Sequence, residues 1–481
     1  MKQKISENLN PDEKTQYKTT YIVAVCIIAA FGGLLFGLDQ GFINGSLVYI
    51  TKDLGLTTTQ GANFAAVLLW GSVIGSLCSG MVSRVIGRKY TLLSTAIIFT
   101  IFSYLSSVAV SIEQLTIYRF ILGLSVGIAS FSVPLYLSEI APTRLRGAFI
   151  SMYQLMVTVG IFMIFVTNSE IAKASSDWRP MFYAITIPAI IMLVGVIMIP
   201  RSPRWLMLKN RVECARKVLN KTRKTQSEVI LDLEYMGKAS VKKQSFLQTI
   251  RNSNFVKVLA LAMTLQLLQQ CTGINAVIYY SSSIFSAAGV PNPTTATVIV
   301  GLVNMLTTIL AVMFVDKIGR KPIMYFGLSI MMITLCIASY IFHCQAVLQV
   351  SGGVLSIMSK NILLGSTLVF IFAFAISAGP ICWMIPAEIF PLKARDAGMT
   401  LSTACNWIFA ALVVQFSLPL MAFPNGSPNP TGGSHLFLFF AICCGLGLLL
   451  MKFCTPETRG VSLEKLEENL DKGIALRKIG K

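Results

Sequence analysis

The chain has 481 residues, of which 54% are hydrophobic and only 13% are charged, whereas an average soluble protein carries about a quarter charged residues. A membrane-spanning helix needs about 20 apolar residues, so this composition can supply about a dozen spans and leaves little for a water-soluble domain. Soluble enzymes are therefore excluded. The formal net charge of +19 would suggest a nucleic-acid partner in a soluble chain, so the location of the basic residues decides what it means.

Long apolar runs predict twelve transmembrane helices along the chain. The predicted fold class is therefore an all-α membrane protein. The expected spans are residues 21–50, 63–82, 90–110, 115–138, 148–169, 181–199, 256–287, 297–315, 322–343, 361–386, 397–422 and 436–453.

The basic residues are distributed unevenly between alternate loops. With twelve spans both termini lie on one side of the membrane, and 35 of the 40 Lys and Arg residues fall on that side. The positive-inside rule then places both termini in the cytoplasm of a multi-pass protein of the cell (inner or plasma) membrane. The excess charge reflects topology and contact with anionic lipids, so we expect no nucleic-acid partner. The basic residues elsewhere are Lys52, Lys173, Arg179 and Lys360 on the other side, and Arg119 within a span.

Cysteine and histidine give no sign of a metal site. Nearly all of the eleven cysteines fall in apolar spans without metal-ligand spacing, which is typical of small packing residues. The only histidines, His343 and His435, lie near the predicted outer face. We therefore expect no metal, no cofactor and no enzymatic activity.

Three motifs occur twice, about 250 residues apart, which indicates a duplicated six-helix unit. Residues 139–146 (EIAPTRLR) return as 388–395 (EIFPLKAR), 80–89 (GMVSRVIGRK) as 314–321 (FVDKIGRK), and 200–204 (PRSPR) as 456–460 (PETRG). The expected organisation is an amino-terminal tail (1–20), a first half (21–200), a basic linker with short amphipathic helices (201–255), a second half (256–453) and a carboxy-terminal tail (454–481).

These motifs, with residues 32–41 (GGLLFGLDQG), 269–280 (QQCTGINAVIYY) and 379–383 (GPICW), resemble the sugar porter branch of the major facilitator superfamily over nearly the whole chain. The resemblance is closest to bacterial sugar–proton symporters of the xylose, galactose and glucose type. It implies two pseudo-symmetric six-helix halves with short cytoplasmic helices between them. Two positions depart from the family pattern, because Ser83 stands where Asp is usual and Arg201 where Glu is usual.

Amide side chains in the seventh span point to a binding site. Gln270 and Asn275 are five residues, or about 140°, apart on a straight helix, so both can face one ligand only if the helix breaks, and Gly273 lies between them. Gly379 and Pro380 suggest a second break in span ten. Discontinuous spans line the sites of many transporters. The alternative is that such amides only bond to neighbouring helices.

Amides donate and accept hydrogen bonds as sugar hydroxyls do, and aromatic faces stack on the apolar side of a pyranose ring. This neutral set favours a monosaccharide substrate. By motif position, the resemblance to sugar porters implies a ligand set of Gln154, Gln269, Gln270, Asn275, Asn304, Gly379, Trp383 and Asn406, with aromatic walls from Phe36, Tyr279 and Phe374.

Two charged residues stand alone in apolar spans. Asp39 in span one and Arg119 in span four need partners at that depth, and helix tilt with a long guanidinium side chain could bring them together. Arginine effectively never releases its proton, so Asp39 is the switchable member and the expected proton-coupling carboxylate. The alternatives are an Arg119 that extends to the outer interface and an Asp39 that faces trapped water.

The repeated loops suggest a cytoplasmic gate. Glu139 and Glu388 end spans four and ten, where unpaired carboxylates would be poorly placed beside anionic lipids. We expect them to join an ion-pair network that holds the halves together, since one exposed pair contributes only about 0–1 kcal/mol. The alternative is that the basic loops only contact lipid. The other expected members are Arg84, Arg146, Asp316, Arg320 and Arg395.

The sequence thus favours a proton-coupled monosaccharide importer that works by alternating access, as a monomer, with the sugar, the proton and membrane lipids as its partners. A facilitative sugar uniporter is the main alternative, but the family's facilitators commonly carry a neutral residue where Asp39 stands. A non-transporting sugar sensor would need a signalling domain, for which the tails are short. An exporter of organic anions would need more cations in the cavity than Arg119.

Overall fold

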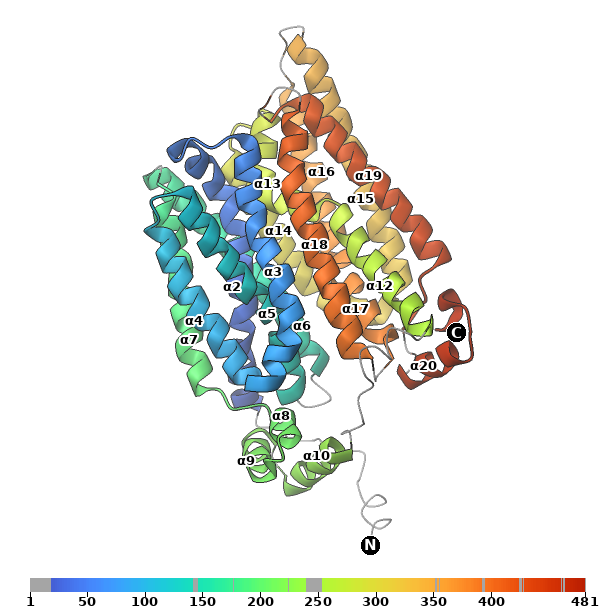
Figure 1. The fold of residues 1–481 in the computed structure, drawn as a ribbon. Helices are drawn as coiled ribbons and strands as arrows, with labels where there is room; N and C mark the ends of the chain where they lie inside the picture. The colour runs from blue at the N-terminus through green and yellow to red at the C-terminus, as the bar shows by residue number, and fades with distance from the viewer. Residues whose placement is uncertain are drawn as a thin grey trace.

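The computed structural model describes residues 19–141, 146–175, 177–223, 225–238, 253–350, 353, 355–391, 394–423, 426, 428–459, 461 and 463–480. In this part of the chain, 12 helical stretches are long and apolar enough to cross a membrane. They form one upright bundle (Figure 1). The predicted all-α membrane fold is confirmed.

The first six spans are single helices. Four of them extend beyond both ends of the predicted apolar runs, because polar residues continue or cap the helix, whereas the third and sixth spans end three residues and one residue earlier than predicted. Thr57, for example, caps the second span through a reciprocal capping box with Gln60. The helices are α2 (Thr19–Asp53), α3 (Thr58–Ile86), α4 (Arg88–Ser107), α5 (Ile112–Ile140), α6 (Arg146–Ala174) and α7 (Arg179–Met198).

The later six spans comprise eight helices, because two of the spans are broken. These helices are α12 (Ser253–Cys271), α13 (Ile274–Ala287), α14 (Pro293–Ile318), α15 (Arg320–Val350), α16 (Ile357–Ile376), α17 (Ala378–Ile389), α18 (Arg395–Ala422) and α19 (Pro430–Phe453).

Both predicted breaks are present. Gly273 separates α12 from α13 and has a left-handed backbone (φ +88°), and a Cβ there would also collide with the ring of Phe440. Only glycine meets both conditions without strain. The second break lies at Ser377, between α16 and α17, two residues before Gly379. Beside the second break, the Gln269 side chain bonds to backbone carbonyls at the start of α17.

Helix α2 is held closely against α6 by a row of small residues. Gly33, Gly37, Gly41 and Gly45 recur every fourth residue, and a Cβ at Gly37 would overlap the carbonyl oxygen of Val157 on α6. Small residues at this spacing let membrane helices approach each other closely. The position of α2, which carries Asp39, is therefore tied to that of α6.

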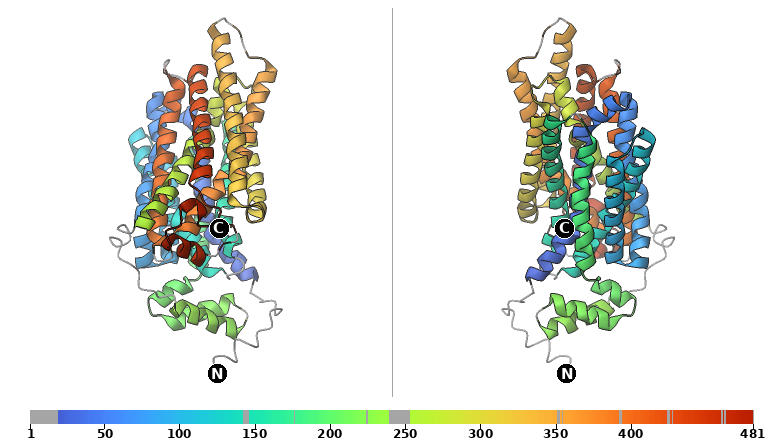
Figure 2. Two further views of the ribbon diagram at one scale, coloured as in Figure 1. Left: turned by 90° about the vertical axis from the view of Figure 1, so that its right-hand side faces the viewer. Right: turned by 90° about the vertical axis from the view of Figure 1, so that its left-hand side faces the viewer.

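Three helices between the halves, α8 (Pro203–Leu208), α9 (Val212–Thr222) and α10 (Gln226–Lys238), lie below the first half, as Figures 1 and 2 show. The predicted short helices of the linker are therefore confirmed. The start of α2 and the final helix α20 (Leu463–Asp471) lie at the same end of the bundle. We call this the basic end, and the opposite one the far end.

Candidate functional site

The two helix breaks gather five buried amide side chains in the middle of the second half. The Asn275 amide nitrogen donates to the Gln270 side-chain oxygen at 2.6 Å, and the Gln270 nitrogen donates to Asn406 of α18 at 3.2 Å. The expected convergence of Gln270 and Asn275 is confirmed, because the break at Gly273 rotates α13 relative to α12. We call Gln266, Gln269, Gln270, Asn275 and Asn406 the amide cluster; each is at most 7% exposed.

The amide cluster also bonds to the backbone beside the second break. The Asn406 nitrogen donates to the side-chain oxygens of Gln266 and Gln269, both at 2.7 Å. The Gln269 nitrogen then donates to the carbonyls of Ala378 and Gly379 at 3.0 Å, at the start of α17. The cluster therefore connects three spans through side chains that are all uncharged.

One residue of the first half joins the cluster. The Gln40 amide nitrogen donates to the Asn275 side-chain oxygen at 2.7 Å, so a hydrogen bond crosses from α2 to α13. One turn further along α2, Asn44 donates to the carbonyl of Ile278 at 2.7 Å and accepts from the backbone N–H of Ser282 at 3.0 Å. Helices α2 and α13 thus meet through two amide side chains.

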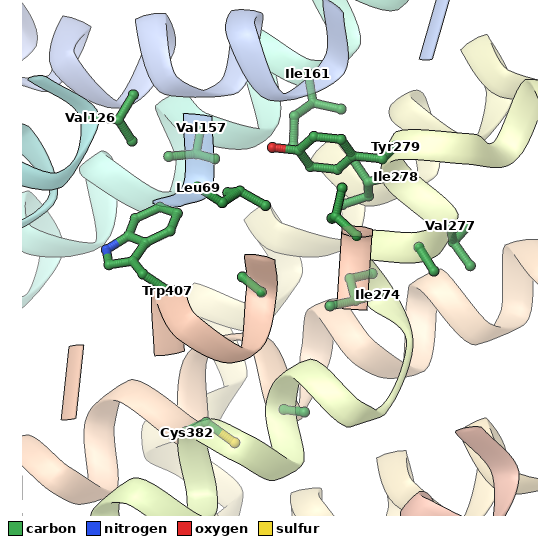
Figure 3. Close-up of a cluster of buried hydrophobic side chains, with 14 of the residues drawn as sticks. Leu69, Val126, Val157, Ile161, Ile274, Val277, Ile278, Tyr279, Cys382 and Trp407 are labelled. Atoms are coloured by element: carbon green, nitrogen blue, oxygen red, sulfur yellow. The ribbon is translucent and has the colours of Figure 1, made fainter. Parts of the chain in front are cut away.

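Figure 3 shows a cluster of buried aromatic and aliphatic side chains that includes Ile274 and Trp407, the sequence neighbours of Asn275 and Asn406. Tyr279 of α13 points its hydroxyl toward Leu69 and Val157, which belong to the first half. Trp407, next to Asn406, packs edge-on against Phe36 with ring centroids 5.2 Å apart. The Tyr279 hydroxyl and the Trp407 indole N–H are buried without a hydrogen-bond partner among the described residues. Such groups are costly unless something satisfies them, so they mark a place where a polar ligand would gain bonds.

Asp39 and Arg119 meet in the core of the first half. An Arg119 terminal nitrogen lies 3.4 Å from a carboxylate oxygen of Asp39, and both residues are 0% exposed. The guanidinium carbon also lies 5.2 Å from the ring centroid of Phe64 and 5.9 Å from that of Phe42. The expected pairing is confirmed, and it excludes the alternative in which Arg119 reaches the outer interface.

This ion pair is incompletely bonded. The second Asp39 oxygen and two of the Arg119 guanidinium nitrogens have no partner among the described residues. Buried ion pairs offset their desolvation cost only with good geometry and additional hydrogen bonds. The pair therefore rests on a single contact of 3.4 Å, with three of its polar atoms left without partners among the described residues.

A cavity of about 720 Å³ lies between the halves on the far-end side of the amide cluster. Its walls come from α2, α6, α13 and α14 and include Asn44, Asn168 and Ser282. Asn44 both lines this cavity and binds α13. The lining mixes amides and hydroxyls with apolar side chains such as Val48 and Phe165, and none of the described residues in it is charged, which suits a neutral solute.

The remaining residues expected around the ligand come from four helices. Asn304 of α14 is buried, and Gln154 of α6, Phe374 of α16 and Trp383 of α17 are half-buried. Phe374 packs within 3.4 Å of the position that a Cβ on Gly379 would take.

Comparison with known proteins agrees with this architecture. Residues 25–470 match the family described as "Sugar (and other) transporter". The chain belongs to this family. The galactose-proton symporter of Escherichia coli (strain K12) is 39% identical over 476 residues, covering 98% of this chain and 99% of the relative. The arabinose-proton symporter of the same strain is 36% identical over 460 residues, covering 95% of each chain.

Among solved structures, the transporter is similar to the proton:xylose symporter XylE of the major facilitator superfamily, bound to 6-bromo-6-deoxy-D-glucose. The TM-score is 0.76 at 28% identity, and the match covers 94% of this chain and 99% of that one. The chain is therefore a sugar porter of the major facilitator superfamily, as the sequence predicted.

At the basic end, the transporter repeats one polar cluster in each half. Arg88 and Glu139 form an ion pair at 2.9 Å, and Ser202 donates to the same carboxylate. In the second half Arg320 and Glu388 form an ion pair at 2.8 Å, and Thr458 donates to that carboxylate. Each arginine directly follows the glycine of its loop, and each hydroxyl comes from the motif that closes its half.

These contacts differ from the expected gate. Arg88 takes the place expected for Arg84, whose exposed side chain lies one turn before the loop glycine and whose carbonyl accepts from the Trp205 indole N–H at 3.0 Å. Both ion pairs also lie within one half, not between the halves. The side chains of Arg146 and Asp316 lie outside the described residues, and Arg395 donates to the carbonyl of Phe390 at 3.4 Å.

The departure from the family pattern at Arg201 has a visible consequence. Glu457 accepts the backbone N–H groups of Arg320 and Lys321 at 3.1 and 2.9 Å and so caps α15. Arg201 occupies the corresponding place in the first half, where it donates to the Tyr90 hydroxyl at 2.7 Å instead.

Three residues near the site were not predicted from the sequence. Gln40 bonds to the amide cluster, Asn44 bonds to α13, and Trp407 packs against Phe36. A polar residue in an apolar span was the available signal for Gln40 and Asn44. That signal does not say which neighbouring helix a side chain faces, and α13 belongs to the other half of the chain.

Replacing Arg119 by methionine should lower the thermal stability of the detergent-purified transporter, because Asp39 is left buried without its partner. Removing one member of a buried pair costs about 3–5 kcal/mol. Adding Asp39→Asn should restore much of the lost stability. The control is Arg179→Met, since Arg179 pairs with Asp53 at a half-exposed position and should matter little. Equal instability of the single and double variants would show that the unpaired carboxylate is not the cause.

Proposed function

We propose that this transporter imports a monosaccharide together with a proton by alternating access. The observation that carries the proposal is the buried, uncharged amide cluster that meets α2 at Gln40, the residue next to the ion-paired Asp39. The sugar would bind at the cluster, and the proton would bind Asp39. All of these groups come from one chain, so a monomer is a sufficient unit.

The chemistry of the cluster supports a sugar as the ligand. Each amide both donates and accepts, so it can exchange its bonds with neighbouring amides for bonds with sugar hydroxyls. Tyr279 and Trp407 add unpaired polar atoms to aromatic rings, which can cover the apolar face of a sugar. The absence of a charge in the cluster itself disfavours ionic substrates.

The relatives support the same substrate class. The similar proteins are symporters whose names specify galactose, arabinose and xylose. These are hexoses and pentoses, and we infer that this transporter also takes a hexose or a pentose. The remaining expected ligand residues, Gln154, Asn304, Phe374, Gly379 and Trp383, would complete the site when the halves close around the sugar.

The incomplete ion pair supports the proton step. In the proposed cycle a proton that enters from outside neutralises Asp39, releases Arg119 and lets α2 move relative to α5. The reverse movement requires the proton to leave inside. One charge that moves through about 100 mV yields about 2.3 kcal/mol, which supports about fifty-fold accumulation of a neutral sugar.

We propose that the basic end faces the cytoplasm, where its Lys and Arg residues contact anionic lipids. Because the ion pairs of Glu139 and Glu388 each lie within one half, we propose that they brace the basic end of that half. Each half could then move as a unit when the gate opens.

Substituting Gln270 or Asn275 by alanine should raise the sugar Kd roughly six- to 150-fold, because a buried hydrogen bond costs about 1–3 kcal/mol when one partner is lost. Calorimetry on the folded variants measures this. Gln345→Ala is the control, since Gln345 is also buried and donates to the Ala287 carbonyl at 2.7 Å but lies outside the cluster. Unchanged sugar affinity in both cluster variants would show that the sugar does not bind at the amide cluster.

Asp39→Asn should abolish sugar accumulation and sugar-driven alkalinisation of the medium while sugar binding persists, because the linkage between proton and sugar is lost. Uptake of labelled sugar into proteoliposomes with an imposed pH gradient measures it. Asp53→Asn is the matched control, since Asp53 ends the same helix at a half-exposed position. Concentrative uptake by Asp39→Asn would mean that another group carries the proton.

Cysteine labelling tests the orientation. Cys214 is exposed on α9 at the basic end, and Lys173 is exposed at the end of α6. With the other exposed cysteines replaced by serine, an impermeant maleimide should label Cys214 only after the cells are permeabilised. It should label Lys173→Cys in intact cells of a variant that lacks Cys214. The opposite pattern would invert the topology.

A further inference from the structure

We propose that Gln40 takes the place of a sugar hydroxyl when the transporter is empty. Its hydrogen bond to Asn275 would let α2 and α13 close against each other without a bound sugar. The inference rests on the proposed function. It assigns to Gln40 a positioning role: the side chain competes with the sugar for Asn275 and holds α2 against α13 when no sugar is present.

The first step of the argument is the geometry of the bond. The Gln40 nitrogen lies 2.7 Å from the Asn275 side-chain oxygen, with Gln40 6% and Asn275 7% exposed. A hydroxyl of a ligand bound at the amide cluster would donate to the same oxygen at the same distance. Gln40 therefore occupies the space of a ligand group, and the ligand must displace it to use Asn275 fully.

The second step is the direction of the hydrogen bonds. Gln40 donates to Asn275, Asn275 to Gln270, and Gln270 to Asn406. Asn406 donates to Gln266 and Gln269, and these donate to backbone carbonyls of α17. The chain of donors begins at Gln40, the only member from the first half. Without Gln40, the Asn275 oxygen would lose the donor that satisfies it in the absence of a ligand, and a buried unsatisfied acceptor is costly.

The third step concerns movement. Alternating access requires α2 and α13 to separate and meet again in each cycle, both with sugar and without it. A bound sugar can bridge the halves through its own hydroxyls. An empty carrier has no such bridge at the amide cluster, and Gln40 supplies one there, one turn from the bonds that Asn44 makes to α13. Because Gln40 follows Asp39 directly on α2, the same helix carries this bridge and the proton-binding carboxylate.

Gln40→Leu tests the proposal, because leucine fills similar space without an amide. In proteoliposomes, labelled galactose, arabinose and xylose serve as probes. The sugar Kd should fall roughly two- to tenfold, in keeping with the loss of one competing hydrogen bond. Net uptake should slow because the empty carrier returns poorly, whereas exchange of internal for external sugar, which needs no empty return, should keep its rate.

The matched control is Gln415→Leu. Gln415 of α18 also bridges the halves, since it accepts from the Trp70 indole N–H and donates to the Asn63 side chain, both at 3.0 Å. Among the described residues it makes no hydrogen bond to the amide cluster, so its loss should leave the sugar Kd unchanged. Gln40→Thr, whose side chain is too short to reach Asn275, is a second variant and should show the same Kd and uptake changes as Gln40→Leu. It replaces the leucine variant in the test if that variant folds poorly.

An unchanged or raised Kd in the Gln40 variants would overturn the proposal, since Gln40 would then be neutral or a sugar ligand. An equal loss of net uptake and exchange in the Gln40 variants would also overturn it. So would slow net uptake with unchanged exchange in Gln415→Leu. Failure of the proposed function is distinct from these results, because it would appear in the unmodified transporter as the lack of binding and uptake of all three sugars.

Discussion

The need to satisfy backbone groups inside a membrane determines how this site is built. Where a helix breaks at bilayer depth, no water is present to bond with the freed N–H and C=O groups. In α17, Pro386 has no N–H to donate to the carbonyl of Cys382, four residues before it, and the Gln266 side chain donates to that carbonyl instead. Gln269 donates to two backbone carbonyls beside the break at Ser377. The residues that bond to this backbone are thus members of the cluster that we propose binds the sugar. On that proposal, stability and recognition depend on the same amides.

A buried charge imposes the second constraint. Asp39 and Arg119 have no contact with water, so each depends on the other and, for Arg119, on the faces of two phenylalanine rings. A fully bonded pair would be stable but difficult to separate. The monodentate contact leaves three polar atoms without partners among the described residues, so this pair is held by fewer hydrogen bonds than its atoms could make.

The sequence predicted the twelve spans well because an apolar run of sufficient length has few alternatives. It also predicted the break at Gly273, from the angle between Gln270 and Asn275, and the Asp39–Arg119 pair, because no other charge was available nearby. The failure at Arg84 has a different origin. Arg84 and Arg88 lie four residues apart in one loop motif, and only the backbone turn at Gly87 (φ +89°) determines that Arg88 faces Glu139. Gln40 was missed because its partner lies 235 residues away.

The placement of Asp39 and Gln40 on one helix has a mechanical consequence. The two side chains leave α2 in different directions, one toward Arg119 on α5 and the other toward Asn275 on α13. The glycine row packs α2 closely against α6, so the backbone around these residues has little freedom to deform locally. In the proposed cycle, a change at the carboxylate moves α2 as a rigid element and displaces the amide of the adjacent residue. On this proposal the two sites are coupled through one helix, and no longer pathway is required.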